Sequence, residues 1–491
     1  MPAMTINFPN EIWAEICAYL PPDNELSMIG LNRYFFEVAM DKIYGTVCMS
    51  DIDDREQTKV LQQLRHPQVA SRVQHLQLCP CFLPLTDHRG KETQSMTFKT
   101  TNFLEQSLKS LCNCARLEKL TIQFHFFRAA TPQFHDFLHT LLSTVAPTLR
   151  SLVITTSVVH LGLMAAVSSC APLLSLDTLN LTILPSYFAD SEGIVRYIEL
   201  PPDIAQCFQE HAHSLLNSIQ PSLRSLYITN HDLFDLSPVF KGLADFLSLE
   251  TLEYQSCSSV ESLSDATSFC DFVKTSTSLS RLSMRVSVHA LWSDGPPRHY
   301  VESVSHFDNL IQHLFRLHLS CLREFLIQLL QYSNISIDLP TFSPNLRRLT
   351  VDSIPLEHYH FKQLLSDISK FSKRQSNGRH LEHLEFLQLK YFSPEHMDMM
   401  ARSLPGLKVL GIGYEILSLE PHRCQLPTPR PSVTYAAGLH QAFRSHVYPS
   451  SRLKEVYLQR VSIGKQGAPK ELLDSLSEAL PNVLFIQGFP P

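Results

Sequence analysis

The chain has 491 residues, of which 44% are hydrophobic and 18% are charged, and its formal net charge is -6. This composition is typical of a folded chain, because disordered chains are poorer in apolar residues and richer in charge. The 41 basic residues are outnumbered by the 47 acidic ones, so the chain lacks the basic excess with which nucleic-acid-binding proteins neutralise phosphates. We therefore expect no nucleic acid among its partners.

The N-terminal sequence MPAMTINFPNEIW contains no basic stretch followed by an apolar core, which argues against a secretory signal. No window of roughly eighteen or more apolar residues occurs, so we also expect no membrane span and no membrane partner. The sequence thus predicts a protein of the cytoplasm, the nucleus or both, whose 12 cysteines are reduced thiols.

Residues 8–44 have the pattern of three short helices. Pro9 suits the first turn of a helix, where the N–H that proline lacks would have no partner, and Pro21-Pro22 is expected to end that helix. A segment this small cannot bury a sufficient core, so we expect its outward apolar residues to contact a partner or a following domain. The apolar residues at helical spacing are Ile12, Ile16 and Leu20 in the first helix, Leu26 and Ile29 in the second, and Phe35, Ala39 and Ile43 in the third.

The rest of the chain repeats one pattern, Leu-x-x-Leu-x-apolar. The last two apolar positions are two residues apart, so on a β-strand both side chains point to one face. Nine strict and three looser copies exceed the roughly three or four that a chain of this composition would contain by chance. The strict copies begin at Leu117, Leu149, Leu176, Leu223, Leu249, Leu279, Leu346, Leu384 and Leu407, and the looser ones at Val73, Leu322 and Leu453.

Helical segments are predicted between the copies. In residues 134–145 the apolar side chains fall at helical spacing, and Pro147 stops the helix before the next strand. Residues 208–219 and 397–404 have the same pattern ahead of a proline. The recurring unit is therefore a helix, a turn that contains proline, and a short strand.

One such unit cannot bury both of its faces, whereas stacked units bury them against each other, as in leucine-rich repeats. We therefore predict an α/β fold in which short parallel strands alternate with helices in a horseshoe-shaped, leucine-rich-repeat-like solenoid over residues 47–491. The asparagine usual after the strand is missing, so the array is divergent. An ordinary α/β sheet with leucine-rich strands is the alternative. Loop insertions are predicted near 83–99, 186–203, 291–305, 372–380 and 418–433.

The N-terminal segment begins Phe8-Pro9-x-Glu11-Ile12, has two prolines after the first helix, and continues Leu31-Asn32-Arg33-Tyr34-Phe35. This pattern resembles the F-box motif, and residues 39–47 resemble the way many fungal F-box proteins lead into their first repeat strand. The resemblance implies a three-helix F-box over residues 7–46 that docks on a Skp-family adaptor and, through it, on a cullin. By this resemblance the adaptor-binding residues are Phe8, Pro9, Ile12, Ile16, Leu20, Leu26, Leu31 and Phe35, some of which must instead form the segment's own core.

The residues beside the buried leucines of each strand are expected to point to the concave side of the solenoid. Most are neutral and polar, which suits recognition of a protein through hydrogen bonds and a few aromatic anchors. The alternative is that they are solvated strand residues without a partner. The candidate substrate face comprises Thr155, Thr182, Tyr227, Thr229, Gln255, Arg285, Gln328, Asp352, Lys390 and Tyr457.

Signatures of catalysis or cofactor binding are absent from the sequence, which contains no GxGxxG, GxxxxGK[ST], GxSxG or HExxH. His358-x-His360, His380-x-x-His383, Cys79-x-Cys81 and Cys112-x-Cys114 have ligand-like spacings, but none has the further ligands of a recognisable zinc site. We therefore expect no cofactor, no metal and no enzyme activity in this chain.

The combination of the two parts favours a substrate-recognition subunit of an SCF-type cullin-RING ubiquitin ligase, in which partner enzymes carry out ubiquitin transfer. The first alternative is a non-catalytic leucine-rich-repeat interaction scaffold that acts outside ubiquitination. The second is an enzyme whose active site lies in a loop insertion. Co-purification with an adaptor would separate the first two.

Overall fold

The computed structural model divides into two compact units, Met1–Leu223 and Arg224–Pro491. The structure describes residues 9–21, 28, 30–51, 53–80, 94–124, 132–170, 176–185, 187–189, 195–197, 201–232, 234–257, 263–287, 300–329, 339–353, 356–374, 381–417, 438, 441–443, 445, 452–461, 470–480 and 483–487.

In the first unit a parallel sheet follows the order of the chain. Its strands are β1 (Thr46–Met49), β2 (His75–Leu78), β3 (Lys119–Gln123), β4 (Ser151–Ser157) and β5 (Thr178–Leu184). The helices are α1 (Asn10–Ala18), α2 (Arg33–Tyr44), α3 (Arg55–Gln63), α4 (Pro67–Ala70), α5 (Gln94–Leu111), α6 (Pro132–Val145), α7 (Leu161–Ser168) and α8 (Pro202–Ile219). An antiparallel pair, β6 (Tyr187–Ala189) and β7 (Val195–Tyr197), lies outside this sheet.

The second unit repeats the arrangement. Its parallel strands are β8 (Ser225–Asn230), β9 (Thr251–Cys257), β10 (Arg281–Ser287), β11 (Glu324–Leu329), β12 (Arg348–Ser353), β13 (His383–Phe392), β14 (Val409–Leu417), β15 (Glu455–Arg460) and β16 (Leu484–Gln487), again in chain order. The helices are α9 (Ser237–Phe240), α10 (Ala266–Thr275), α11 (Tyr300–Phe315), α12 (Leu339–Phe342), α13 (His358–Arg374), α14 (Pro394–Ser403) and α16 (Lys470–Ala479).

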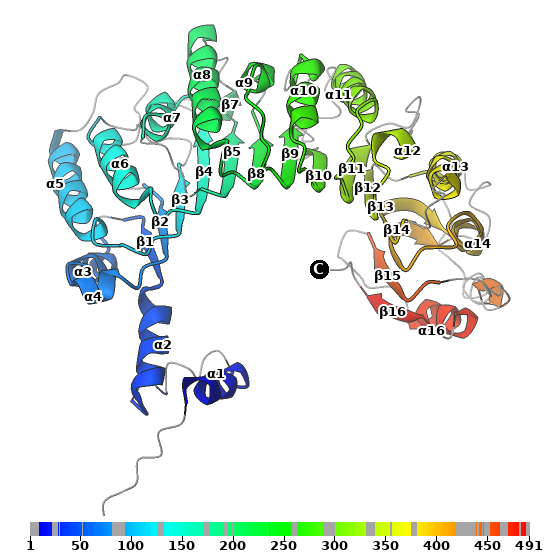
Figure 1. The fold of residues 1–491 in the computed structure, drawn as a ribbon, viewed down its shortest axis with the longest axis horizontal. Coiled ribbons are helices and arrows are strands. Elements are labelled where there is room, and N and C mark those ends of the chain that lie inside the picture. Colours follow the sequence, from blue (N-terminus) through cyan, green and yellow to red (C-terminus); the bar gives the residue numbers. More distant parts are fainter. Residues whose placement is uncertain are drawn as a thin grey trace, which may run out of the picture. The chain divides into compact units, whose positions relative to one another are not determined.

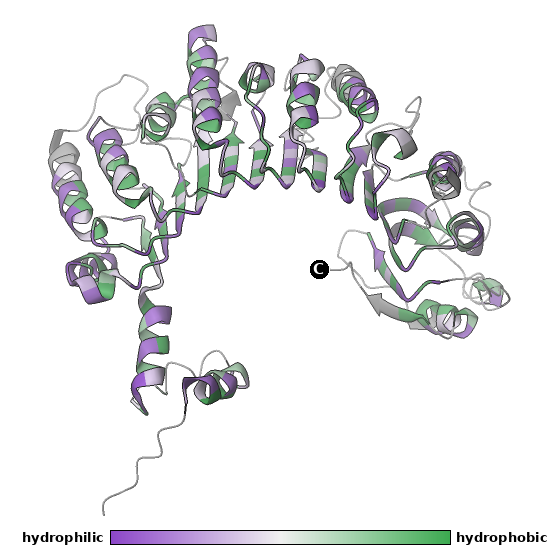
Figure 2. Ribbon diagram, in the orientation of Figure 1, coloured by the Kyte–Doolittle hydropathy of each residue, from purple (hydrophilic) through white to green (hydrophobic). Residues whose placement is uncertain are grey.

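The strand order confirms the leucine-rich-repeat-like solenoid. Within each unit, every strand of the parallel sheet pairs with the next strand of that sheet along the chain, and the helices of the repeats lie against one face of the strands (Figure 1). The opposite face, here called the open face, carries the residues that alternate with the buried ones, and apolar and polar bands alternate along the strands (Figure 2). A doubly wound α/β sheet would instead reverse its strand order and place helices on both faces, so that alternative is excluded.

The repeated leucines form the core. Leu120, Leu152, Leu226 and Leu282, each the second leucine of a copy, are fully buried. The predicted helix over residues 134–145 is confirmed as α6, whose apolar residues are all buried. Each fully buried leucine contributes about 1.5–3 kcal/mol of transfer free energy. Because the units of the array are stacked, a similar core layer recurs along each of the two compact units.

A ladder of backbone hydrogen bonds joins the turns that lead into neighbouring strands. The residue after the first leucine of a copy accepts two bonds from the next copy. Arg323 O, for example, accepts from Arg347 N at 2.8 Å and Arg348 N at 3.0 Å. The same pair of bonds reaches Glu118 O from Arg150 N and Ser151 N. These bonds satisfy backbone polar groups in the turns at the start of the strands.

One predicted copy has the wrong register. The copy predicted from Leu384 actually begins at Leu381, because Leu384 pairs with Leu349 on one side and Leu410 on the other, and Phe386 pairs with Val351 and Ile412. Both readings fit the sequence, since apolar residues continue past Phe386. Pairing with the neighbouring strands decides between them, because a shifted register would misplace the buried side chains.

Several predicted loop insertions are partly helical. Residues 94–99 belong to α5, residues 300–305 to α11, residues 372–374 to α13, and residues 202–203 to α8. The polar residues at these positions favour a loop in the sequence. In the structure they form the ends of helices whose remaining turns carry apolar residues. Residues 83–93, 291–299, 375–380 and 418–433 lie outside the described residues.

Candidate functional site

The N-terminal segment contains two described helices, α1 and α2. Asn32 caps α2 by accepting a 3.0 Å hydrogen bond from Phe35 N, which satisfies one of the free N–H groups at the helix start. Phe35 packs inward, with its ring 5.4 Å from that of Trp13 in an edge-on contact. Residues 22–27, where part of the second predicted helix falls, lie outside the described residues.

Arg72 attaches α2 to the first repeats. Its guanidinium forms ion pairs with Glu37 and with Asp41, the latter at 2.6 Å, and also donates to the Glu37 carbonyl at 3.3 Å. The hydrogen bond from Arg72 lowers the pKa of Glu37. One planar guanidinium thus contacts α2 at two of its turns from the segment that precedes β2, which fixes the helix against the solenoid.

The predicted adaptor-binding residues separate into two groups. Ile12 and Ile16 on α1 are 42% and 37% exposed. Pro9 and Leu31 are also exposed, and Leu20 is half-buried. Phe35 is buried in the segment's own core, which corrects its assignment to the adaptor surface. Phe8 and Leu26 lie outside the described residues.

The candidate substrate residues of the first unit share one row. Thr155 pairs with Gln123 on β3 and with Thr182 on β5. Gln123 accepts a 3.1 Å hydrogen bond from Gln77 on β2. The open face of this unit is therefore lined by neutral polar side chains, some of which bond to one another across strands.

In the second unit most of the predicted residues also form rows. Thr229, Gln255 and Arg285 pair in register on β8, β9 and β10. Gln328 pairs with Asp352, and Tyr227 and Tyr457 occupy the neighbouring row on their own strands.

Lys390 does not belong to these rows, because of the shifted register of β13. It lies beyond the β13 bulge and forms a 2.9 Å ion pair with Glu357. Its side chain therefore has an acidic partner within the array, and we remove it from the candidate substrate face.

The corrected register places Glu385 on the open face, a residue that the sequence did not single out. Its carboxylate accepts from Arg348 at 2.8 Å and from Thr350 at 3.0 Å, and it lies 2.5 Å from the His383 ring. Glu385 is only 6% exposed. Burial favours its neutral form, but the His383 hydrogen bond and the Arg348 charge outweigh this, so the pKa of Glu385 lies below its ordinary value.

Gly411 makes room for this cluster. A Cβ at that position would lie 2.7 Å from Glu385 Cγ, closer than side chains approach. Beyond Gly411, Tyr457 donates a 3.0 Å hydrogen bond to Glu455. Neighbouring strands thus carry a buried carboxylate, an arginine, an imidazole and a phenol on one face. We add this group to the candidate substrate face.

We predict that Glu385→Ala lowers the free energy of unfolding by about 1–3 kcal/mol, because it leaves buried hydrogen-bond donors without an acceptor. Urea denaturation near neutral pH measures the change. Glu357→Ala, which removes an exposed carboxylate from its pair with Lys390, should change stability by no more than about 0.5 kcal/mol. Equal effects of the two substitutions would show that the Glu385 cluster adds nothing to stability.

The ligand-like histidine and cysteine pairs do not assemble a metal site among the described residues. Burial raises the pKa of the Cys114 thiol to about 12, which disfavours the thiolate that zinc binds. His380 and Cys81 lie outside the described residues. In the part of the chain that the structure describes, no helix is both long and apolar enough to cross a bilayer.

No family model matches the chain, and no curated protein matches it in sequence. Among solved structures, it is similar to the complex of Rad7 and Elc1 from yeast, with 13% identity, 85% of this chain and 90% of that chain covered, and a TM-score of 0.33. It is also similar to a protein from Bacteroides fragilis, with 12% identity, 51% and 74% coverage, and a TM-score of 0.24. At these TM-scores neither likeness supports an inference about partners, and the fold rests on the strand order and buried leucines described above.

Proposed function

We propose that this chain is the substrate-recognition subunit of an SCF-type cullin-RING ubiquitin ligase. The N-terminal segment would dock on a Skp-family adaptor and, through it, on a cullin, and the open face of the solenoid would bind a protein substrate. The observation that carries the proposal is α1, which buries none of its residues although Ile12 and Ile16 form an apolar stripe along it.

A helix of nine residues is marginal in water on its own, because its nucleation is costly and short helices gain few hydrogen bonds. Apolar residues on such a helix are stabilised when another surface covers them. An adaptor that accepts α1 would supply this surface, and the F-box-like sequence around it is the second support for the proposal. The open face, with its paired polar and charged residues, suits protein recognition rather than catalysis.

We predict that Ile12→Asp together with Ile16→Asp reduces recovery of a Skp-family adaptor in co-purification by about tenfold or more, because each substitution places a charge in an apolar interface. The matched control is Val159→Asp, which alters a side chain of similar exposure (39%) elsewhere in the first unit. The control should leave adaptor recovery unchanged. Circular dichroism spectra should be the same for all three proteins, because the altered side chains are exposed.

Two results would contradict the proposal. The first is that the wild-type chain purifies without adaptor when both are expressed together. The second is that the double variant recovers as much adaptor as wild type. Either result would favour the alternative, a leucine-rich-repeat interaction scaffold that acts outside ubiquitination.

A further inference from the structure

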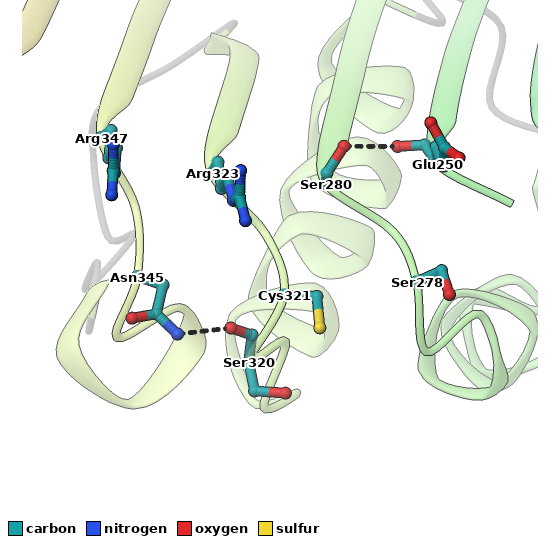
Figure 3. Close-up of a pocket in the computed structure, with 8 residues that line it drawn as sticks. All are labelled: Glu250, Ser278, Ser280, Ser320, Cys321, Arg323, Asn345 and Arg347. Carbon is teal, nitrogen blue, oxygen red and sulfur yellow. Dashed lines mark hydrogen bonds between the residues drawn. The ribbon is translucent and has the colours of Figure 1, made fainter.

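A polar groove runs along the edge of the second unit where the strands begin. It has a volume of about 530 Å³ and lies over the turns that lead into β10, β11 and β12. Figure 3 shows Arg323 and Arg347 extending from neighbouring strands toward the turns that carry Ser320, Cys321 and Asn345. The groove lies at the edge of the sheet and does not include the Glu385 cluster.

The charges around this groove are arranged unevenly. In each copy, one residue follows the first leucine and takes part in the backbone ladder, and we call these residues the edge row. The edge row of the second unit is Arg224, Glu250, Ser280, Arg323, Arg347, Glu382, Lys408 and Lys454.

Two pairs of neighbours in the edge row neutralise each other. Arg224 lies 3.5 Å from Glu250, and Lys408 lies 3.0 Å from Glu382. Between these pairs stand Arg323 and Arg347, which occupy adjacent rungs of the ladder. Neither guanidinium has a carboxylate or other acceptor among the described residues. Adjacent strands are about 4.8 Å apart, so two like charges face the same groove.

The walls of the groove supply hydrogen-bond donors and a rigid frame. Asn345 donates a 2.7 Å hydrogen bond to the Ser320 carbonyl, which joins two neighbouring turns. Ser280 is held in the same way by the Glu250 carbonyl at 3.1 Å. Ser278 and Ser320 add hydroxyls to the lining. The turns are therefore fixed before any ligand arrives, which lowers the entropic cost of binding.

We propose that this groove binds an oxyanion carried by a segment of a partner protein, held between Arg323 and Arg347. Guanidinium groups bind carboxylates and phosphates through paired hydrogen bonds, and two of them together match the charge of a phosphoryl group. A phosphorylated side chain and an acidic one present the same kind of oxyanion, so both are candidate sources. The inference rests on the proposed function for the idea that the ligand is a substrate segment, but its test requires no adaptor.

Cys321 provides a reporter, because its exposed thiol lines the groove. The full chain is incubated with pools of short peptides that have randomised flanks and a central phosphoserine, aspartate or serine. The rate of iodoacetamide alkylation at Cys321 is then measured by mass spectrometry, with the exposed Cys112 of the first unit as an internal reference. We expect the phosphoserine pool to slow alkylation of Cys321 by about threefold or more relative to Cys112, and the serine pool to have no effect.

The aspartate pool distinguishes the two sources of the oxyanion. If it protects Cys321 as well as the phosphoserine pool does, a carboxylate is sufficient, and if it does not, the groove requires phosphorylation. Arg323→Ala with Arg347→Ala should abolish the protection. The lysine replacements Arg323→Lys with Arg347→Lys should weaken it, because an ammonium lacks the planar fork. For each variant, the alkylation rate of Cys321 is compared with and without peptide, because loss of a nearby charge also alters the reactivity of the thiol itself.

Lys454→Ala is the matched control, because it removes one positive charge from the edge row at an exposed residue that does not line the groove. It should retain the protection. The inference is overturned if no pool protects Cys321, if the serine pool protects it equally, or if the double alanine variant is still protected. The variant with Ile12→Asp and Ile16→Asp should keep the protection, so failure of adaptor docking and failure of this site give different results.

Discussion

Replacing Phe269 with alanine is expected to lower the free energy of unfolding of the second unit by about 3–5 kcal/mol. Phe269 lies on α10 and is fully buried. Its ring is 5.0 Å from that of Phe240 on α9 and 5.4 Å from that of Tyr254 on β9. The substitution removes a large apolar surface and leaves a cavity that three elements line, and these elements can close it only in part.

Urea denaturation followed by circular dichroism measures this loss, and hydrogen exchange at the amides of β9 and β10 locates it. The control is Tyr359→Ala, which removes an exposed aromatic ring from α13 and should change stability by no more than about 0.5 kcal/mol. Because the repeats are stabilised mainly by their neighbours, the variant is also expected to unfold over a broader range of urea. A shift no larger than that of the control would contradict the role of the aromatic cluster.

Acid is expected to destabilise the second unit through His396. This imidazole is buried. Burial, and to a smaller extent the nearby His358, lowers its pKa from 6.5 to about 3. Its Nε2 lies 3.1 Å from Nδ1 of His358, and its Nδ1 lies 2.8 Å from the Ser393 hydroxyl. The folded protein therefore holds His396 neutral over a pH range in which the unfolded chain protonates it.

The direction of the effect follows from proton uptake on unfolding. Above pH 6.5 neither state protonates His396, so its contribution to stability is fully present. As the pH falls from 6.5 toward about 3, unfolding takes up a proton at this residue and stability declines. The slope approaches about 1.4 kcal/mol per pH unit, which gives a loss of roughly 2 kcal/mol between pH 6.5 and pH 5.

His396→Gln should reduce this slope, because glutamine can retain a hydrogen bond and does not titrate. Urea midpoints measured between pH 5 and pH 7 would test this for both proteins. The window avoids Glu385, whose pKa lies below 4.5 in the folded state and whose contribution is therefore lost only as the pH falls below that value. Parallel pH dependences for His396→Gln and wild type would rule out His396 as the acid-sensitive group.

The sequence predicted the repeating architecture because each repeat uses the same local rule. An apolar pair at strand spacing follows a helix with an apolar stripe, and both must be buried against neighbours. Thus the predicted helix over 208–219 is confirmed within α8, and that over 397–404 corresponds closely to α14. The repeat pattern does not predict the strand β16, because no leucine at the required spacing precedes it.

The polar part of the site was less accessible to sequence analysis. In Leu381–Leu389 the apolar residues satisfy the repeat pattern in two registers, and the nine residues themselves contain nothing that selects one. The choice depends on Leu349 and Leu410, which lie on other strands. For the same reason the repeat pattern selects Lys390 for the candidate substrate face and does not select Glu385. Burial of Phe35 was likewise undecided, because its spacing suits both the core and the surface of a small helical segment.

The backbone ladder between repeats has a consequence for how such a chain can change over time. Each seam is formed by main-chain N–H and C=O groups, which every residue except proline possesses. When a copy is duplicated, deleted or lengthened, the copies that become neighbours can therefore form the same main-chain hydrogen bonds, whatever side chains they carry. Adjacent strands begin at Glu324 and Arg348 in one place and at Val409 and Glu455 in another. Both pairs of strands are nevertheless preceded by the same pair of backbone hydrogen bonds. The array can accordingly acquire new surface residues one repeat at a time while the backbone hydrogen bonds between repeats stay the same.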